Sequence, residues 1–431
     1  MNRIKLKYFC EVRDGTHDTP MYVDESEHSY HFVTSKDIKN GEINFNKTKF
    51  ISESDYNLFQ KRSNVEKFDV LMPMIGTVGN PVVVLTDIKF SIKNLALFKT
   101  NGNFLKASYL SYVLDSQLLK EQLSKQIRGG VQNFVSLSIL NNIEIPISEN
   151  IDLIVQFLNF KLNKIDSLIN SKERQIKLLE EQRQAMITEA VTKGLNPNVK
   201  MKDSGVDWIG EIPEHWDVTK IKYTTYVKGR IGWQGLRSDE FIDEGPSLVT
   251  GTDFKNGKID WQTCYHVSEE RYKEAVPIQL QEDDLLITKD GTIGKLALVK
   301  EMPERAILNS GIFVTRPLMN QYINNYLYWN LASASFSQYI RTMETGSTIK
   351  HLYQETFVNY NYALPPKDEQ ESISYYLNNE TQKLETIKQS MLNQISKLKE
   401  YRQSLIHEAV TGKIPMEEME TYLKEVEKNG G

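Results

Sequence analysis

Residues 151–193, IDLIVQFLNFKLNKIDSLINSKERQIKLLEEQRQAMITEAVTK, are the stretch that decides the fold. Apolar residues recur through it in alternating steps of four and three, as at Val155, Leu158, Leu162 and Ile165. This is the heptad spacing of a coiled coil, and it predicts one helix about 65 Å long. Such a helix is too long for the core of a small domain, and its mixed polar face is too polar for a membrane. It therefore requires a partner helix.

The same chain supplies that partner. The sequence EEQRQAMITEAVTKG at 180–194 recurs as EYRQSLIHEAVTGK at 400–413, with Arg183 matching Arg402 at an offset of 219 residues. An arginine on each seam is expected to fix the register of the pair at some cost in stability. The predicted coiled-coil and subunit interface comprises Leu158, Leu162, Ile165, Ile176, Leu179, Arg183, Leu384, Met391, Ile395, Leu398, Arg402 and Leu405.

The helix repeat is the end of a longer repeat. IKLKY at 4–8 returns as KIKY at 220–223, VTSKDIKNGEIN at 33–44 as VTGTDFKNGKID at 249–260, and DVLMPMIGTVGN at 69–80 as DLLITKDGTIGK at 284–295. The alignment matches Asn94 and Phe98 with Asn309 and Phe313, and continues through helical stretches at 109–123 and 326–340. Short apolar strands with proline, IEIPI at 143–147 and YALPP at 362–366, lead into the two long helices.

These repeats predict an α+β fold. Two similar globular modules are joined by two long helices that form an intramolecular antiparallel coiled coil with pseudo-two-fold symmetry. Val-, Ile- and Tyr-rich runs between Asn-Gly and Asp-Gly turns indicate that each module is mostly strand, with one or two helices. The predicted boundaries are 1–145 for the first module, 146–195 for the central helix, 196–215 for a linker, 216–364 for the second module, and 365–431 for the distal helix and tail.

Composition excludes several classes of protein. Cys10 and Cys264 lie in unrelated contexts, and the seven histidines do not pair at metal-ligand spacing, so neither a disulfide framework nor a metal site is predicted. We expect a cytoplasmic protein without a leader or a membrane segment. The net charge of −5 still permits DNA binding, because phosphate contacts depend on local clusters of Lys and Arg.

Motifs for catalysis are also missing from the sequence. GTIGK at 291–295 has the wrong spacing for a phosphate-binding loop, and we interpret it as a turn between strands. Neither a G-x-G-x-x-G motif nor an Asn-Pro-Pro-aromatic motif of amino-methyltransferases occurs.

With these residues in view, the chain resembles a specificity subunit (HsdS) of a type I restriction-modification enzyme. The resemblance covers nearly the whole length and is carried by EEQRQAMITEAVTKGL, KLKEYRQSLIHEAVTGKI and VDWIGEIPEHWDV. It implies a non-catalytic reader of double-stranded DNA whose helices dock two methyltransferase (HsdM) subunits and, in the full enzyme, restriction/translocase (HsdR) subunits. It also implies that S-adenosylmethionine, ATP and Mg belong to those partners and that this chain has no cofactor of its own.

Four polar loops are candidates for DNA contact: DGTHDTP at 14–20, KGRIGWQGLR at 228–237, and the glycine-bearing loops at 128–133 and 345–351. Arginine and amide side chains read base edges, Asp accepts from cytosine, and Lys contacts phosphate. The alternative is that these loops are simple turns and helix ends. The candidate residues are Arg13, Asp14, Thr16, His17, Arg128, Gln132, Asn133, Lys228, Arg230, Gln234, Arg237, Thr348, Lys350 and His351. The tyrosine-rich stretch 322–331 repeats at helical spacing and is assigned to the core.

A different class of function also fits the sequence, namely a coiled-coil scaffold for protein interactions without sequence-specific DNA binding. A gel-shift assay with a random pool of DNA would separate the two. An independent nuclease or methyltransferase is opposed by the missing motifs.

The repeat generates a first prediction. Residues 1 to about 200 contain one module and one seam helix, so two copies should pair as a homodimer with true two-fold symmetry. Expressed with the methyltransferase partner, this half-chain should direct methylation to a palindrome, both halves of which match the half-site read by module one. Methylation sequencing checks this: an asymmetric split motif, or a stable monomer in light scattering, would contradict the interchangeability of the helices.

Overall fold

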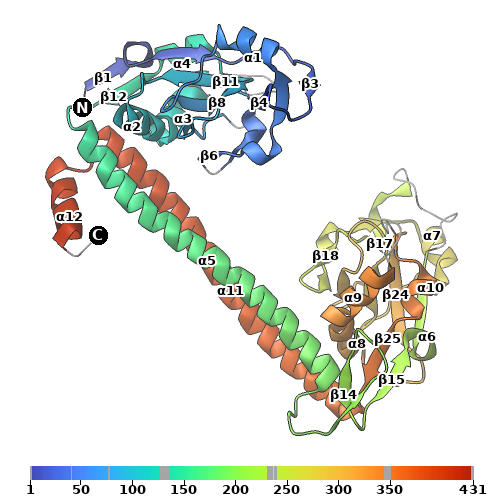
Figure 1. Ribbon diagram of the computed structural model, residues 1–431. Coiled ribbons are helices and arrows are strands. Elements are labelled where there is room, and N and C mark those ends of the chain that lie inside the picture. Colours follow the sequence, from blue (N-terminus) through green and yellow to red (C-terminus); the bar gives the residue numbers. More distant parts are fainter. Residues whose placement is uncertain are drawn as a thin grey trace. The chain divides into compact units, whose positions relative to one another are not determined.

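The structure is a computed structural model that describes residues 2–39, 41–75, 78–126, 135–230, 236, 240–343 and 351–428 (Figure 1). Clustering of contacts divides the chain into two compact units. Unit 1 comprises Met1–Glu173 and Leu392–Gly431, and unit 2 comprises Arg174–Met391. The two long helices are α5 (Ile151–Lys193) and α11 (Lys367–Thr411), so each unit holds one module and a segment of both helices. The prediction of one helix over 151–193 is confirmed.

Module one, in unit 1, is a mixed α+β structure. Its strands are β1 (Asn2–Lys5), β2 (Glu11–Asp14), β3 (Tyr22–Val23), β4 (Ser29–Val33), β5 (Ile38–Lys39), β6 (Glu42–Ile43), β7 (Lys49–Ser52), β8 (Val70–Pro73), β9 (Val82–Val83), β10 (Phe90–Ile92), β11 (Leu95–Lys99) and β12 (Glu144–Ile147). Its helices are η1 (Leu6–Tyr8), η2 (Ser35–Asp37), η3 (Phe45–Lys47), α1 (Glu53–Gln60), α2 (Phe104–Asp115), α3 (Gln117–Gln126) and α4 (Leu137–Asn142). Helix α12 (Met416–Lys428) follows α11 and also belongs to unit 1.

Module two, in unit 2, repeats this element order. Its strands are β13 (Met201–Asp203), β14 (Glu211–Pro213), β15 (Asp217–Lys220), β16 (Thr225–Gly229), β17 (Ile242–Val249), β18 (Phe254–Lys255), β19 (Lys258–Ile259), β20 (Tyr265–His266), β21 (Leu285–Thr288), β22 (Leu296–Leu298), β23 (Ala306–Leu308), β24 (Ile312–Pro317) and β25 (Asn361–Leu364). Its helices are α6 (Ile221–Thr224), η6 (Trp261–Thr263), α7 (Glu269–Glu274), η7 (Val276–Ile278), α8 (Asn324–Leu331), α9 (Ala334–Met343) and α10 (Gln354–Val358).

The sheets show that the two modules have the same internal plan. The order β2-β11-β8-β9 in module one corresponds to β16-β24-β21-β22 in module two, where β19 and β18 extend the sheet. In each module a second sheet contains one parallel pair, β10 with β4 and β23 with β17. The strands that precede the long helices, β12 and β25, pair with the first strands β1 and β15. The predicted strands at IEIPI and YALPP are therefore confirmed.

The expectation of one or two helices per module is wrong for the described residues. Module one contains α1, α2, α3 and α4, because short segments between its strands carry helix-initiating side chains. Ser52, Asn103 and Ser136 each accept a hydrogen bond from the backbone N–H three residues further on. Capping of this kind stabilises helices that are too short to form on propensity alone.

The strand register corrects one part of the sequence alignment. Ala96 pairs with Asp14 and Met72, while Phe313 pairs with Gly229 and Ile287. Phe313 therefore corresponds to Ala96, and the match of Asn94 and Phe98 with Asn309 and Phe313 is wrong. Asn309 instead corresponds to Lys93, because each donates its backbone N–H to the end of the parallel strand, Lys93 to Val33 and Asn309 to Val249, at 2.9 Å. The connection from β23 to β24 is longer than that from β10 to β11, which shifts the alignment.

Each module contains one buried ion pair at the same place. In module one, Lys99 Nζ lies 2.6 Å from the Asp69 carboxylate, which is fully buried. In module two, Arg316 on β24 binds Asp284, with contacts of 2.6 Å to both carboxylate oxygens. The hydrogen bond to Asp284 raises the pKa of Arg316 above its ordinary value, so the guanidinium stays charged. Each pair ties the start of one central strand to the end of its neighbour.

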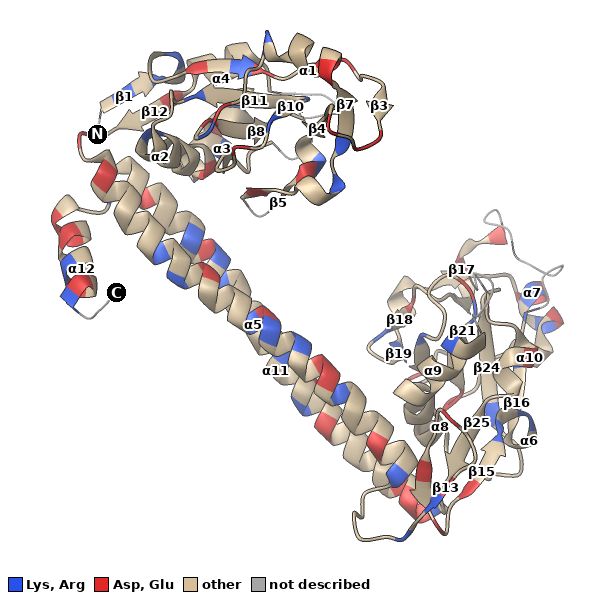
Figure 2. Cartoon of the chain, viewed as in Figure 1, with Lys and Arg blue, Asp and Glu red and all other residues tan. Residues whose placement is uncertain are grey.

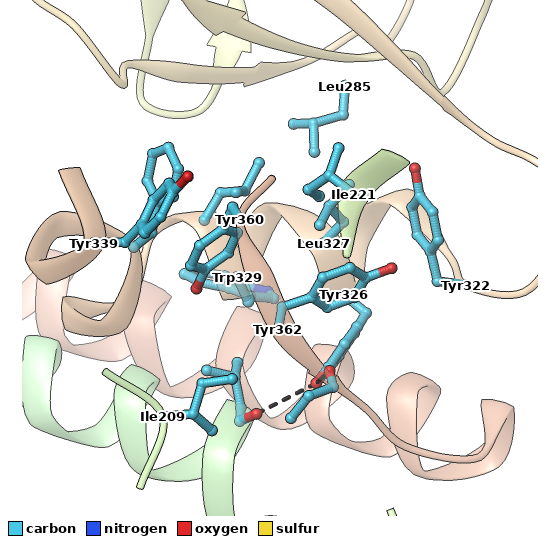
Figure 3. Packing of buried hydrophobic residues seen from close by; sticks show 14 of the residues in the cluster. Ile209, Ile221, Leu285, Tyr322, Tyr326, Leu327, Trp329, Tyr339, Tyr360 and Tyr362 are labelled. Atoms are coloured by element: carbon cyan, nitrogen blue, oxygen red, sulfur yellow. Dashed lines mark hydrogen bonds between the residues drawn. The ribbon is translucent and has the colours of Figure 1, made fainter. Parts of the chain in front are cut away.

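The core of unit 2 joins the module to the long helices (Figure 3). Ile187 and Val191 near the end of α5, and Ile373 and Leu377 near the start of α11, belong to the same hydrophobic cluster as the module. The module contributes an aromatic group to this cluster, made of Trp216, Tyr322, Tyr326, Trp329, Tyr339, Tyr360 and Tyr362. The assignment of the 322–331 stretch to the core is confirmed, since Tyr322 and Tyr326 are fully buried.

The two long helices pair antiparallel within each unit. In unit 1, Arg402 contacts Asp166 at 3.1 Å and Lys172 contacts Gln394 at 2.5 Å, so positions on α5 rise as those on α11 fall. In unit 2, Lys388 pairs with Glu180 at 2.8 Å. Charges of both signs are interspersed along the two helices (Figure 2), and some of them make contacts between the helices.

Burial of the predicted seam residues varies along the helices. Leu158, Leu162, Ile165, Ile395 and Leu405 are buried. Ile176, Leu179, Arg183, Leu384, Met391, Leu398 and Arg402 are half-buried. Most of the half-buried positions, such as Ile176, Leu179, Leu384 and Met391, lie in the middle part of each helix. The end segments that pack into the module cores are more deeply buried.

Two leucine-sized positions on α5 provide a matched test of the seam. Ile165 is 5% exposed and Leu168 is 52% exposed. Ile165→Glu places a carboxylate in the apolar contact and should lower the free energy of unfolding by about 2 to 5 kcal/mol. Leu168→Glu should change it by less than about 0.5 kcal/mol. Urea denaturation of the purified full chain measures both; equal stability of the two variants would show that Ile165 is not part of a packed seam.

Candidate nucleic-acid interface

In module one, several loops meet at one edge of the central sheet. They are residues 14–20 after β2, the segment after β8, the turn between β10 and β11, and Val135 before α4. Backbone hydrogen bonds join them in sequence: Asn94 N to Thr16 O at 3.3 Å, Met74 N to Asn94 O at 3.3 Å, and Val135 N to Met74 O at 3.0 Å. We call this group the loop edge of module one.

Module two repeats two of these three bonds. Lys289 N donates to Gly311 O at 2.7 Å, and Leu352 N donates to Lys289 O at 2.7 Å. Lys289 follows β21 as Met74 follows β8, and Leu352 precedes α10 as Val135 precedes α4. The main chain of the two edges is therefore equivalent at these two bonds, although the side chains around them differ.

Glycine is required at one point of this frame. A Cβ atom on Gly15 would lie 2.4 Å from the carbonyl oxygen of Ile92. The loop 14–20 thus approaches the β10–β11 turn more closely than any side chain permits.

Asp14, a candidate for base reading, is an internal anchor in this structure. Its side chain is largely buried, and both carboxylate oxygens accept from Arg62 at 2.7 Å. His17 Nε2 lies 3.0 Å from the same carboxylate, and His17 Nδ1 lies 2.9 Å from Asn94 Oδ1. Both nitrogens of His17 are therefore engaged inside the module, and the network fixes the position of the loop.

The other candidates of module one differ in exposure. Thr16 is buried, and its hydroxyl accepts from the backbone N–H of Asp18 at 3.1 Å, as in a tight turn. Arg13 lies on β2 and makes two contacts of 2.8 Å with Glu11. The hydrogen bond from Arg13 lowers the pKa of Glu11, so this exposed pair is charged at neutral pH.

In module two, Arg230 is largely buried and donates from Nε to the Leu308 carbonyl oxygen at 3.0 Å. Burial lowers the pKa of Arg230, with a further contribution from Arg271. The guanidinium thus binds the end of β23 inside the module. Lys228, two residues earlier on β16, is half-buried.

His351 is a half-buried candidate of module two. Its Nδ1 is hydrogen-bonded to Asp290 Oδ1, and its ring contacts that of Tyr353 edge-on at 4.9 Å between centroids. Tyr353 is 64% exposed. When Asp290 holds Nδ1–H, the neutral imidazole keeps Nε2 as an acceptor, and the imidazolium keeps it as a donor.

The remaining candidates, Arg128, Gln132, Asn133, Gln234, Arg237, Thr348 and Lys350, lie outside the described residues. Their roles, like those of the described candidates, stay predictions.

Sequence reasoning missed four side chains at the two loop edges. Arg62 holds Asp14, and Lys93 contacts the hydroxyl of Thr19. Lys289 lies over the ring of Phe313 at 5.2 Å, and Tyr353 stands beside His351. Lys93 and Lys289 each follow an apolar strand directly, which is a signal that the sequence contains. No local pattern links Arg62 to Asp14, because they meet only in the folded module.

The seam arginines are also placed by tertiary contacts. Arg402 contacts Asp166 at 3.1 Å and Asp115 at 3.3 Å, and Gln403 donates to Asp115 at 3.0 Å. These bonds connect the long helix to α2 of module one. Arg183 in unit 2 lines an open cleft of about 940 Å³ together with Lys258, Trp329 and Glu385.

The described residues contain no group of three or more His, Cys, Asp or Glu side chains arranged to hold a metal ion. Among the helices of the described ranges, none is both long and apolar enough to cross a bilayer.

Comparison with known proteins identifies the class of this chain. Residues 232–397 match the family model "Type I restriction modification DNA specificity domain". The chain is 24% identical over 395 residues to the type I restriction enzyme MjaVIII specificity subunit of Methanocaldococcus jannaschii, covering 89% of this chain and 86% of the relative. It is 25% identical over 169 residues to the EcoBI specificity subunit of Escherichia coli, covering 36% of this chain and 34% of the relative.

A solved structure supports the fold. The chain from "Structural basis underlying complex assembly and conformational transition of the type I R-M system" superposes with a TM-score of 0.68 at 16% identity, covering 95% of this chain and 97% of that chain. The resemblance inferred from the sequence motifs is confirmed: over most of its length the chain is similar to specificity subunits (HsdS) of type I restriction-modification systems. Its function is sequence-specific recognition of DNA.

The burial of Arg230 generates a prediction for the loop at 228–237. Arg230→Ala should lower the thermal stability of module two, because it removes a buried side chain and its hydrogen bond to the Leu308 carbonyl oxygen, and the less stable module should bind all DNA sequences more weakly. Arg237→Ala tests the second candidate arginine of the same stretch. If Arg237 reads guanine, the variant should lose about 1 to 3 kcal/mol of binding and relax one position of one half-site. Thermal unfolding and binding to a panel of single-base variants measure both. Normal stability with weakened binding in Arg230→Ala would show that this arginine contacts DNA directly.

Proposed function

We propose that this chain is the non-catalytic subunit that selects a bipartite, asymmetric DNA site, with each module reading one half-site. The observation that carries the proposal is the pair of loop edges, which share two main-chain hydrogen bonds and differ in side chains. A shared frame presents loops to DNA in the same way twice. Different side chains on that frame then select different bases.

The chemistry available at each edge supports reading rather than catalysis. In module one, Arg62, His17 and Asn94 hold the loop 14–20 in place around Asp14. In module two, the Asp290-bound His351 has Nε2 for a base edge or a phosphate. Neutral His351 would accept from adenine N6 or cytosine N4, and the imidazolium would donate to guanine or phosphate. Tyr353 beside it offers a ring for apolar contact.

Partners complete the function in this proposal. Two methyltransferase subunits dock on the long helices, and restriction/translocase subunits join the full enzyme. S-adenosylmethionine, ATP and Mg are bound by those subunits. The predicted docking residues are the seam positions with remaining exposure, such as Leu179, Leu384 and Leu398. The scaffold alternative is not favoured, because the family match is to a DNA specificity domain.

Methylation mapping tests the proposal. Coexpression of this chain with its methyltransferase partner in a host without other methylation should produce adenine methylation at a split motif with two different halves. The partner expressed alone is the control and should leave the motif unmethylated. A continuous motif would refute the assignment of one half-site to each module, and methylation independent of this chain would refute its role as the reader.

A further inference from the structure

A short motif repeated in both modules is not used by the loop edges. KLKY at residues 5–8 and KIKY at residues 220–223 occupy equivalent positions, at the junction of β1 with η1 and of β15 with α6. We call these the two KxKY motifs. We propose that they are sequence-independent binding sites for the phosphodiester backbone of the DNA, one at each half-site; this inference rests on the proposed function.

The first argument is exposure. Tyr8 is 73% exposed and Tyr223 is 65% exposed, although a large aromatic side chain gains free energy from burial. The neighbouring lysine lies near each ring in the same way, with Lys7 Nζ 5.1 Å from the Tyr8 centroid and Lys222 Nζ 5.0 Å from the Tyr223 centroid. The fold therefore presents the same cationic and aromatic group on both modules.

The second argument is charge. Many surface lysines of this acidic chain are paired, such as Lys67 with Asp87 at 2.7 Å and Lys200 with Glu214 at 2.7 Å. Across the described ranges, the ion pairs include none of the four motif lysines, Lys5, Lys7, Lys220 and Lys222. Unpaired lysines next to a phenolic hydroxyl provide the donors that contact DNA phosphates.

The third argument is the fixed spacing between each motif and its loop edge. Leu6 N donates to Ile143 O at 2.9 Å, and Ile221 N donates to Tyr360 O at 3.1 Å. Only the short helix α4 or α10 separates these carbonyls from the loop edge, and such a helix spans about 9 Å. The major groove is about 12 Å wide. The two lengths are similar. When the major groove of a duplex faces the loop edge, one phosphate backbone that borders the groove therefore lies near the KxKY motif.

The ligand of the KxKY motifs is inferred by comparing the residues that the two modules share with those that differ between them. The side chains at the loop edges differ between the modules, as the two halves of an asymmetric site require. The KxKY motifs are the same, so they fit a feature that is the same at both half-sites. The backbone of DNA is such a feature, and lysine suits it as a mobile point charge that does not select a base.

The test measures the salt dependence of DNA binding by the complex of this chain with its methyltransferase partner. The probes are a labelled duplex containing the methylated motif and an unrelated duplex of equal length. The variants are Lys5→Gln with Lys7→Gln, and Lys220→Gln with Lys222→Gln. The control is Lys428→Gln in α12, an exposed lysine outside both modules.

Removal of one lysine–phosphate interaction should reduce the slope of log K against log salt by about 0.9, and a double variant should therefore reduce it by up to ~1.8. The reduction should be similar on both probes and for both motifs, with the methylated motif unchanged, and the control should keep the wild-type slope. Glutamine retains the length and polarity of each side chain; for a variant that fails to fold, Tyr8→Phe and Tyr223→Phe remove only the hydroxyl and should weaken binding to both probes.

Wild-type slopes in the folded variants would overturn the inference. Loss of the methyltransferase subunit in gel filtration, with slopes unchanged, would also overturn it and identify the motifs as a docking surface for that protein. Absence of a split motif for the wild-type complex would refute the proposed function instead, and slopes on the unrelated duplex would still decide whether the motifs bind phosphate.

Discussion

The apolar seam of α5 is the constraint on which the rest of the structure depends. A helix of this length cannot bury such a seam by itself. In water, intrinsic helix propensity alone gives it little stability. The seam of α5 is covered by α11, a helix with a similar apolar seam that runs in the opposite direction within each unit. Because the ends of both helices also enter the module cores, as Val191 and Leu377 do in unit 2, each module is fixed directly to the helix pair.

Within each module, stability and recognition are assigned to different parts. The buried pairs Asp69 with Lys99 and Asp284 with Arg316 occupy the same position, as do the backbone bonds of the loop edges. A substitution in this frame would leave a buried charge or a buried backbone group unpaired, which is costly. Loop side chains outside this frame and outside the Asp14 network, such as the exposed Tyr353, can change at smaller cost. The repeat therefore keeps its frame while its loops diverge.

The sequence predicted the long helix, the repeat and the strands at 143–147 and 362–366, because these depend on periodicity and local chemistry. It could not predict what depends on tertiary contacts. Asp14 has the chemistry of a base-reading residue, and no local pattern shows that Arg62, which follows α1 and is distant in the sequence, binds both of its oxygens. Nor does the sequence show that Arg230 is largely buried and bound to the Leu308 carbonyl oxygen. The number of short helices was underestimated because a helix such as α4, with 6 residues, is too short to show a helical period in its apolar residues.

Recognition of two unequal half-sites by one chain requires a balance between selective and uniform contacts. If every contact were selective, the protein would bind unrelated DNA too weakly to search along it; if every contact were uniform, no half-site would be distinguished. The chain has a net charge of −5, and some of its surface lysines are held by carboxylates, such as Lys67 by Asp87 and Lys200 by Glu214. Placing unpaired lysines at the same point of both modules gives each half-site an equal uniform contribution. The loop edges are then left to determine the sequence, and a change in one loop alters one half of the motif without changing the affinity supplied by the frame.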